Sequence, residues 1–219
     1  MSNRSIHTLL KNWDEECPLT REEAVEVLNL PEEEMDSLME CAYALRTKYK
    51  GKKVSVQLLT NVRSGNCTQN CAYCAQSKDS QAEIEKYKRV SDEKLYGDND
   101  LVDEKHLARH CIGLSGIGFS DEEIEDLADR IREMKKKDTQ ICCSIGFLTE
   151  KQARILKDAG LDRINHNLNS SRSFYPEICT THTYDQRVNN IKMLQSLGFE
   201  ICSGGIVGMG ESKEDIVDM

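Results

Sequence analysis

The pattern of apolar and polar positions divides the chain into a short helical stretch and a longer stretch of alternating strands and helices. Thr20 and Glu23 form a capping box just before an apolar run. Pro31 stands at the first turn of a second predicted helix, which carries an apolar stripe from Met35 to Leu45. We therefore predict a helical segment over residues 1–50 and a second domain over residues 51–219.

Short β-type runs alternate with amphipathic helices throughout the second domain. Repeated strand–helix units of this length predict an α/β fold with a parallel sheet and right-handed crossovers. A complete (β/α)8 TIM-type barrel needs about 250 residues, so we expect an incomplete barrel of about five βα units. A truncated product explains this better than an unusual open sheet, which is the alternative. The predicted strands cover residues 54–60, 107–114, 140–146, 163–168 and 200–207, and the helices named between them cover 120–137, 149–159 and 185–197.

Composition and charge narrow the class of protein. Charged residues make up 31% and apolar residues 38% of the chain, as in ordinary globular domains. The net charge of −9 argues against nucleic acid and anionic membrane surfaces as partners. No apolar run is long enough to span a bilayer, and residues 1–13 lack the apolar core of a secretory signal. We expect a cytoplasmic protein, in which ten cysteines include metal ligands and do not form a disulfide framework.

Three of these cysteines have the spacing of a cluster-binding loop. Cys67, Cys71 and Cys74 follow the first predicted strand in a C-x3-C-x2-C arrangement. Three thiolates at this spacing can hold three irons of a [4Fe–4S] cluster and leave the fourth iron open for catalysis. Chance and a structural zinc site are the alternatives, but zinc needs a fourth ligand, and no further Cys or His occurs before Tyr87.

A second group of thiols lies on three different predicted strands. The two-residue period of a strand places Arg109 beside Cys111, Cys142 beside Ser144, and Cys202 beside Gly204. Asn165 and Asn167 share a face in the same way. Polar side chains on one face of a parallel sheet are costly unless they bind something, so Cys111, Cys142 and Cys202 are candidates for a second metal site. The alternative is that each thiol is a small buried side chain, as we expect for Cys143, which faces the other way.

The C-x3-C-x2-C loop resembles the radical S-adenosylmethionine superfamily. Within that superfamily, four segments closely resemble the biotin synthase family: Ser64–Ser77, Asn165–Ser171, Thr180–Arg187 and Cys202–Glu211. The resemblance extends from Val54 to Met219. It implies a barrel-fold sulfurtransferase that inserts sulfur into dethiobiotin to give biotin, using S-adenosylmethionine cleaved to a 5′-deoxyadenosyl radical.

The resemblance also implies roles for the matching residues. Cys67, Cys71 and Cys74 would bind the [4Fe–4S] cluster, and Cys111, Cys142 and Cys202 an auxiliary [2Fe–2S] cluster that donates sulfur, with Arg109 beside it. Asn165 and Asn167 would contact the substrate, and Asn167 the cofactor ribose too. The residues expected to bind S-adenosylmethionine are Tyr73, Asn167, Asn169, Arg187, Gly204, Ile206, Gly208 and Glu211. Read without the resemblance, Tyr73 is a packing residue, Arg187 a solvated helix residue and Glu211 a charge near a helix N-terminus.

The expected partners are dethiobiotin, a flavodoxin- or ferredoxin-type electron donor and a second copy in a homodimer. Two features depart from the family: Asn169 stands where the better-known members have aspartate, and Cys142 is followed by Cys143. The fourth auxiliary ligand would lie beyond Met219, so we expect this 219-residue chain to bind the first cluster poorly and to turn over little. The rival readings are a hydrogenase-maturation or methylornithine-forming relative, and a non-catalytic iron–sulfur protein.

Overall fold

The computed structural model describes residues 19–219, which form two compact units. One unit contains residues 19–54 and 211–218, and the other contains residues 55–210 with Met219. None of the described helices is long and apolar enough to cross a membrane. The sequence-based domain boundary at residue 50 stays a prediction.

The smaller unit is helical, as the sequence predicts. Helix α2 (Arg21–Leu28) begins at the expected capping box of Thr20 and Glu23, and helix α3 covers Met35–Lys50. Pro31 does not open an α-helix: it precedes a 3-10 turn, η1 (Glu32–Glu34), because its fixed φ suits the residue before the turn. Helix α9 (Lys213–Asp218) packs on α2, where Arg21 Nε lies 2.9 Å from Asp218 Oδ1.

The larger unit contains a five-stranded parallel sheet in the order β1-β2-β3-β4-β5, which confirms the α/β, partial-barrel prediction. Its strands are β1 (Gln57–Arg63), β2 (Arg109–Leu114), β3 (Ile141–Ser144), β4 (Arg163–Asn165) and β5 (Glu200–Cys202). Its helices are α4 (Asp92–Glu104), α5 (Asp121–Met134), α6 (Glu150–Asp158), α7 (Tyr175–Ile178) and α8 (Tyr184–Ser196).

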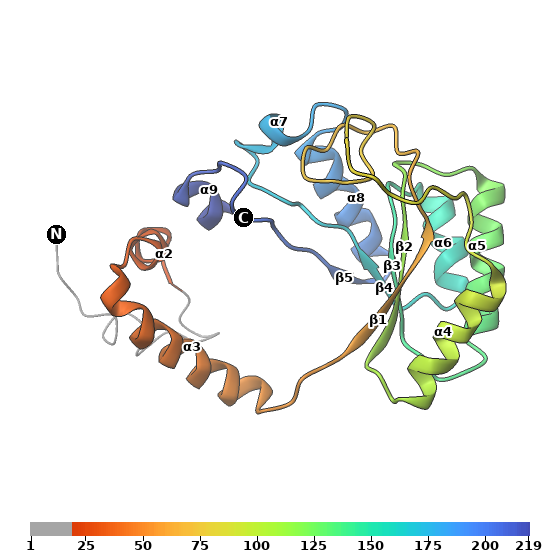
Figure 1. The fold of residues 1–219 in the computed structure, drawn as a ribbon, viewed down its shortest axis with the longest axis horizontal. Coiled ribbons are helices and arrows are strands. Elements are labelled where there is room, and N and C mark those ends of the chain that lie inside the picture. Colours follow the sequence, from red (N-terminus) through yellow and green to blue (C-terminus); the bar gives the residue numbers. More distant parts are fainter. Residues whose placement is uncertain (1–18) are drawn as a thin grey trace. The chain divides into compact units, whose positions relative to one another are not determined.

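Helices α4, α5, α6 and α8 cover one face of this sheet, in sequence order from yellow-green to blue in Figure 1. The buried core between them includes Ile112, Cys143 and Ile164 from the strands and Leu95 and Leu194 from the helices. The other face carries the remaining alternate residues of each strand. Cys143 therefore points into the helix-covered core, as the strand period predicts.

Gly146 allows two loops to approach closely beyond the ends of β2 and β3. The backbone N–H of Phe147 donates to the carbonyl of Ile117 at 2.7 Å. A Cβ on Gly146 would lie 2.4 Å from that carbonyl oxygen, which a real Cβ cannot do. Absence of a side chain at position 146 therefore lets the loop carry Phe147 toward α8.

We predict that Gly146→Ala lowers the free energy of unfolding by about 2 kcal/mol, because backbone must move to admit the methyl group. Gly118→Ala is the matched control: a Cβ there meets nothing within 4 Å, and we expect a change within about 0.5 kcal/mol. Urea unfolding of both variants measures the difference. Equal midpoints would contradict the close approach.

Candidate metal centre

The three cysteines of the predicted cluster motif lie on one loop between β1 and α4. Gly65 (φ 72°) and Asn66 (φ 55°) turn the chain out of the sheet, both in the left-handed region. Cys71 is buried, whereas Cys67 and Cys74 are half-buried. The backbone N–H of Cys74 donates to the carbonyl of Cys71 at 3.1 Å, and this bond closes a turn over the second half of the motif.

This loop is docked on the segment that joins α7 to α8, and the two lie side by side at the top of Figure 1. The side-chain oxygen of Asn70 accepts from the backbone N–H groups of Thr180 (3.1 Å) and Thr181 (3.3 Å). Its amide nitrogen donates to the Thr180 hydroxyl at 2.7 Å. The backbone N–H of Ala72 donates to the carbonyl of Ile178 at 2.9 Å. One asparagine therefore joins segments that are more than a hundred residues apart in sequence.

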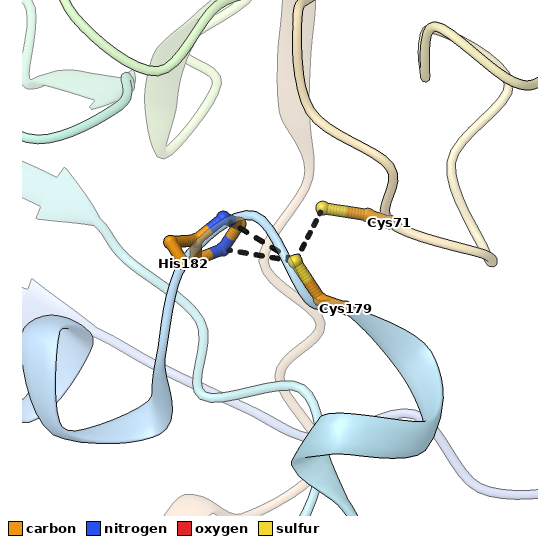
Figure 2. Close-up of side chains that lie close together, drawn as sticks. All are labelled: Cys71, Cys179 and His182. Carbon is orange, nitrogen blue, oxygen red and sulfur yellow. Dashed lines mark hydrogen bonds between the residues drawn. The ribbon is translucent and has the colours of Figure 1, made fainter.

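Docking brings two further ligand-type side chains to Cys71. Figure 2 shows Cys71 Sγ facing Cys179 Sγ at 3.8 Å, and Cys179 Sγ facing the ring of His182, 3.3 Å from Nδ1. Burial, and secondarily Cys179, raises the pKa of the Cys71 thiol to about 12. Among the residues that the structure describes, this trio is the group of Cys, His and acidic side chains whose ligand atoms lie close enough to share one metal ion.

The predicted cluster ligands do not form such a group, and their role stays a prediction. A cube places each thiolate on a different iron, so its ligands need not be within reach of one ion. Three thiols on one loop, at the ends of parallel strands where sites of this architecture lie, fit a cluster with three protein ligands.

Arg187 of α8 lies at the centre of a polar group beside this loop. Its Nε donates to the Tyr175 hydroxyl at 2.6 Å, and its Nη1 donates to the Asn167 carbonyl at 3.1 Å. Its Nη2 lies 2.9 Å from His182 Nε2. Burial, and then the charge of Arg187, lowers the pKa of His182 to about 4, so this ring is neutral near pH 7. A neutral ring and a fixed guanidinium leave one net positive charge here, suited to a carboxylate.

The predicted cofactor residues Tyr73, Asn169, Gly204 and Ile206 are brought together. Asn169 adopts a left-handed conformation (φ 70°), and its side-chain amide donates to the Tyr73 hydroxyl at 2.6 Å. Its backbone N–H donates to Gly204 O (2.9 Å), and its carbonyl accepts from Ile206 N–H (2.8 Å). Gly208 follows in the same loop with a φ of 99°. Glu211 belongs to the other compact unit.

The second group of thiols lies on the sheet face that the helices leave uncovered. Strand register pairs Cys111 with Cys142, Cys142 with Arg163, and Asn165 with Cys202. Because residues two apart on a strand share a face, this register puts all three thiols on the same face of the sheet. Burial, then Cys111 and Cys202, raises the pKa of Cys142 to about 12. The structure thus gathers the predicted auxiliary ligands.

Two half-buried arginines, Arg109 and Arg163, lie beside these thiols and contain buried nitrogens that have no hydrogen-bond partner. Arg109 Nε and Nη1 and Arg163 Nε are buried without a hydrogen-bond partner, although each guanidinium forms an ion pair with Glu200. Asn165 Oδ1 on the same face is also unpaired. Unpaired buried donors are costly, and thiolates bound to a metal cluster would satisfy them. The residues present therefore fit an anionic auxiliary group.

Four residues of these groups were not predicted from the sequence: Arg163, Asn70, Cys179 and His182. Arg163 precedes Asn165 by two positions, so the strand period could have placed it on the same face. Asn70, Cys179 and His182 gave no signal of that kind. Their contacts arise from long-range packing between the cluster loop and the α7–α8 segment.

Residues 61–219 match the model of the radical SAM superfamily. The chain belongs to that superfamily. It is 41% identical over 202 residues to a biotin synthase of Geobacillus kaustophilus and to one of Bacillus subtilis strain 168. A biotin synthase of Rhodopirellula baltica is 40% identical over 203 residues. These alignments cover 92% of this chain but 61%, 60% and 56% of the relatives, so the chain spans about three-fifths of their length.

Solved structures show the same fold in more distant proteins. Methylornithine synthase superposes with a TM-score of 0.83 at 16% identity, over 96% of this chain and 61% of that one. The FeFe-hydrogenase maturase of Carboxydothermus hydrogenoformans superposes with a TM-score of 0.81 at 21% identity, over 97% and 50%. Identities this low establish the fold alone.

We predict that Asn70→Ala releases the α7–α8 segment from the cluster loop. Loss of an acceptor shared by two amides should speed hydrogen exchange at Thr180 and Thr181 about fivefold, since one such bond contributes about 1 kcal/mol. Asn70→Asp keeps the acceptor oxygens and should leave these rates near those of the unaltered chain. Amide-resolved exchange by NMR measures both, and unchanged rates in Asn70→Ala would contradict the docking role.

Proposed function

We propose that the chain carries the radical core of a biotin-forming enzyme, which inserts sulfur into dethiobiotin with S-adenosylmethionine as radical source. The observation that carries this proposal is the second thiol group: Cys111, Cys142 and Cys202 share the sheet face opposite the helices with two half-buried arginines, whose buried nitrogens include some without a hydrogen-bond partner. The 41% identity to biotin synthases supports the same reading.

Cys67, Cys71 and Cys74 would hold a [4Fe–4S] cluster, and Cys111, Cys142 and Cys202 the sulfur-donating auxiliary cluster. When bound, these groups supply the electron that cleaves S-adenosylmethionine and the sulfide that enters the substrate. The chain would bind and orient the substrate and S-adenosylmethionine and exclude water from them. None of its side chains needs to act as an acid or a base.

Arg187 would bind the carboxylate of S-adenosylmethionine. Tyr175 and the Asn167 carbonyl hold its Nε and Nη1, which fixes the plane of the guanidinium before any ligand arrives. Tyr73, Asn169, Gly204 and Ile206 already form one hydrogen-bonded group and would line the adenosine. We extend the same role to Gly208 and Glu211 from the resemblance alone.

Asn165 and Asn167 would bind the ureido ring of dethiobiotin. A ureido group offers both N–H donors and a carbonyl acceptor, which side-chain amides complement. The unpaired Asn165 Oδ1 is an acceptor of the required kind on the same face as the auxiliary thiols. Arg109 and Arg163 would balance the negative charge of the auxiliary cluster there.

A different radical enzyme of similar build is the second candidate. The solved structures of methylornithine synthase and the hydrogenase maturase share the fold, but at 16–21% identity they do not favour those reactions for this chain. A second metal group is what separates the candidates, since a sulfur-donating reaction requires it. The electron donor would be a flavodoxin- or ferredoxin-type protein, and the assembly a homodimer.

Deuterium transfer tests the proposed substrate. The chain, reconstituted without oxygen and reduced with dithionite, is mixed with S-adenosylmethionine and dethiobiotin deuterated at its methyl group. We expect deuterium in the small amount of 5′-deoxyadenosine that the cluster-loaded fraction of the chain forms in a single turnover, measured by mass spectrometry. Unlabelled 5′-deoxyadenosine would contradict dethiobiotin as the substrate, although the cleavage itself would still support a radical S-adenosylmethionine enzyme. Absence of any cleavage by iron-loaded chain would favour a non-catalytic iron–sulfur protein.

We predict that cysteine substitutions separate the two metal groups. Cys74→Ser should remove the iron of the first cluster and abolish cleavage, whereas Cys111→Ser should remove only auxiliary iron and leave cleavage in place. Cys41→Ser, in the helical unit, is the control and should retain the full iron and sulfide content. Equal iron loss in Cys74→Ser and Cys111→Ser would contradict two independent groups.

A further inference from the structure

We propose that Cys71, Cys179 and His182 form a site for a single soft divalent cation, Zn²⁺ or Fe²⁺, and that its occupancy excludes the iron–sulfur cluster. All three side chains are buried, and they converge from the cluster loop and the α7–α8 segment (Figure 2). The exclusion rests on the proposed function, because it assumes that Cys71 is a cluster ligand.

The distances already match those around one tetrahedral ion. Metal–sulfur bonds of about 2.3 Å at the tetrahedral angle put two sulfur ligands about 3.8 Å apart. The Sγ atoms of Cys71 and Cys179 lie 3.8 Å apart, and Cys179 Sγ lies 3.8 Å from His182 Nε2. One ligand atom from each residue, with either ring nitrogen counted for His182, lies within 4.8 Å of the other two. An ion can therefore enter between the two sulfurs once the His182 ring turns its Nε2 lone pair from Arg187 toward them.

The surroundings of His182 select Nε2 as the ligand atom. Its Nδ1 lies 2.9 Å from the Gln69 side-chain oxygen, an acceptor that holds a proton on Nδ1. A second-shell acceptor of this kind is usual for metal-binding histidines, since it fixes both tautomer and ring orientation. The Nε2 lone pair now faces Arg187, which keeps its bonds to Tyr175 and Asn167 when Nε2 turns to a metal.

The chemistry of the donor set selects a soft ion. Two thiols and one imidazole suit Zn²⁺ or Fe²⁺ and disfavour Mg²⁺ or Ca²⁺. Binding converts both thiols to thiolates and releases two protons. Three protein ligands leave a fourth position for water or an exogenous ligand.

Because both sites use Cys71, the chain can hold either the single cation or the iron–sulfur cluster at this loop, but not both. One thiolate that is committed to the single ion, with Cys179 and His182, is no longer available to the irons of the cluster loop. The same loop docking that Asn70 secures holds Cys71 against Cys179. Zinc should therefore slow cluster assembly through Cys179 and His182, which lie outside the C-x3-C-x2-C motif.

Cobalt(II) spectroscopy tests the site directly. The cluster-free chain, reduced and free of oxygen, is titrated with Co²⁺, whose tetrahedral ligand-field bands and thiolate charge-transfer absorption report the ligands. A Cys111→Ser background removes the second thiol group as a competing site. We expect one Co²⁺ per chain, with binding weakened at least tenfold in Cys179→Ser and in His182→Gln.

Cys67→Ser and Cys74→Ser are the matched controls, and both should keep the Co²⁺ spectrum. Hydrogen exchange of core amides checks that each variant is folded. A spectrum that depends on Cys67 and Cys74 but not on Cys179 would overturn the proposal, as would the absence of tetrahedral Co²⁺ from the folded chain.

Competition tests the exclusion. Zn²⁺ added before iron and sulfide should slow cluster assembly in the unaltered chain about tenfold more than in Cys179→Ser. Equal assembly with and without Zn²⁺ would overturn the exclusion while leaving the cation site intact. If the chain assembles no cluster at all, the proposed function fails, whereas the Co²⁺ result still decides the cation site.

Discussion

Parallel hydrogen bonding between neighbouring strands determines where the side chains of the larger unit lie. In register, Cys111 pairs with Cys142 and Cys142 with Arg163, while Asn165 pairs with Cys202. A shift of one residue in any pair would turn its thiol into the helix-covered core. Cys143 shows the consequence: one position beyond Cys142, it is fully buried among apolar residues. The uncovered face can collect thiols, amides and arginines only because the register holds.

The cluster loop depends on a different contact. It has no strand or helix of its own around the cysteines, and its docking relies on Asn70 and a few backbone bonds to the α7–α8 segment. Polar bonds of this kind contribute about 1 kcal/mol each, far less than the core beneath. In our proposal, a loop held this way exchanges the partners of Cys71, from Cys179 and His182 to the irons of a cluster that Cys67 and Cys74 would also bind.

The spacing of apolar residues along the chain predicted the helices and strands that bury a regular apolar stripe. Contacts that arise from long-range packing could not be predicted in this way. The parallel sheet and helices α5, α6 and α8 followed from period and capping, although β1 lies about three residues later than expected. Strands β4 and β5 begin where predicted but end at Asn165 and Cys202, before the predicted ends at residues 168 and 207. Helix α4 gave no clear signal, since Gly97 and several Asp residues interrupt it and only Leu95 and Val102 are buried apolar residues. Contacts of Cys179 and His182 with Cys71 cannot be read from sequence spacing.

We propose that three thiols of one loop hold an iron–sulfur cube with one iron open to S-adenosylmethionine. Mössbauer spectroscopy of the chain reconstituted with ⁵⁷Fe, before and after addition of S-adenosylmethionine, tests it most directly. In the fraction of the chain that carries a cluster, we expect a four-iron component in which S-adenosylmethionine alters the signal of one iron and leaves the other three unchanged. A spectrum without a four-iron component, or one that S-adenosylmethionine does not alter, would contradict it.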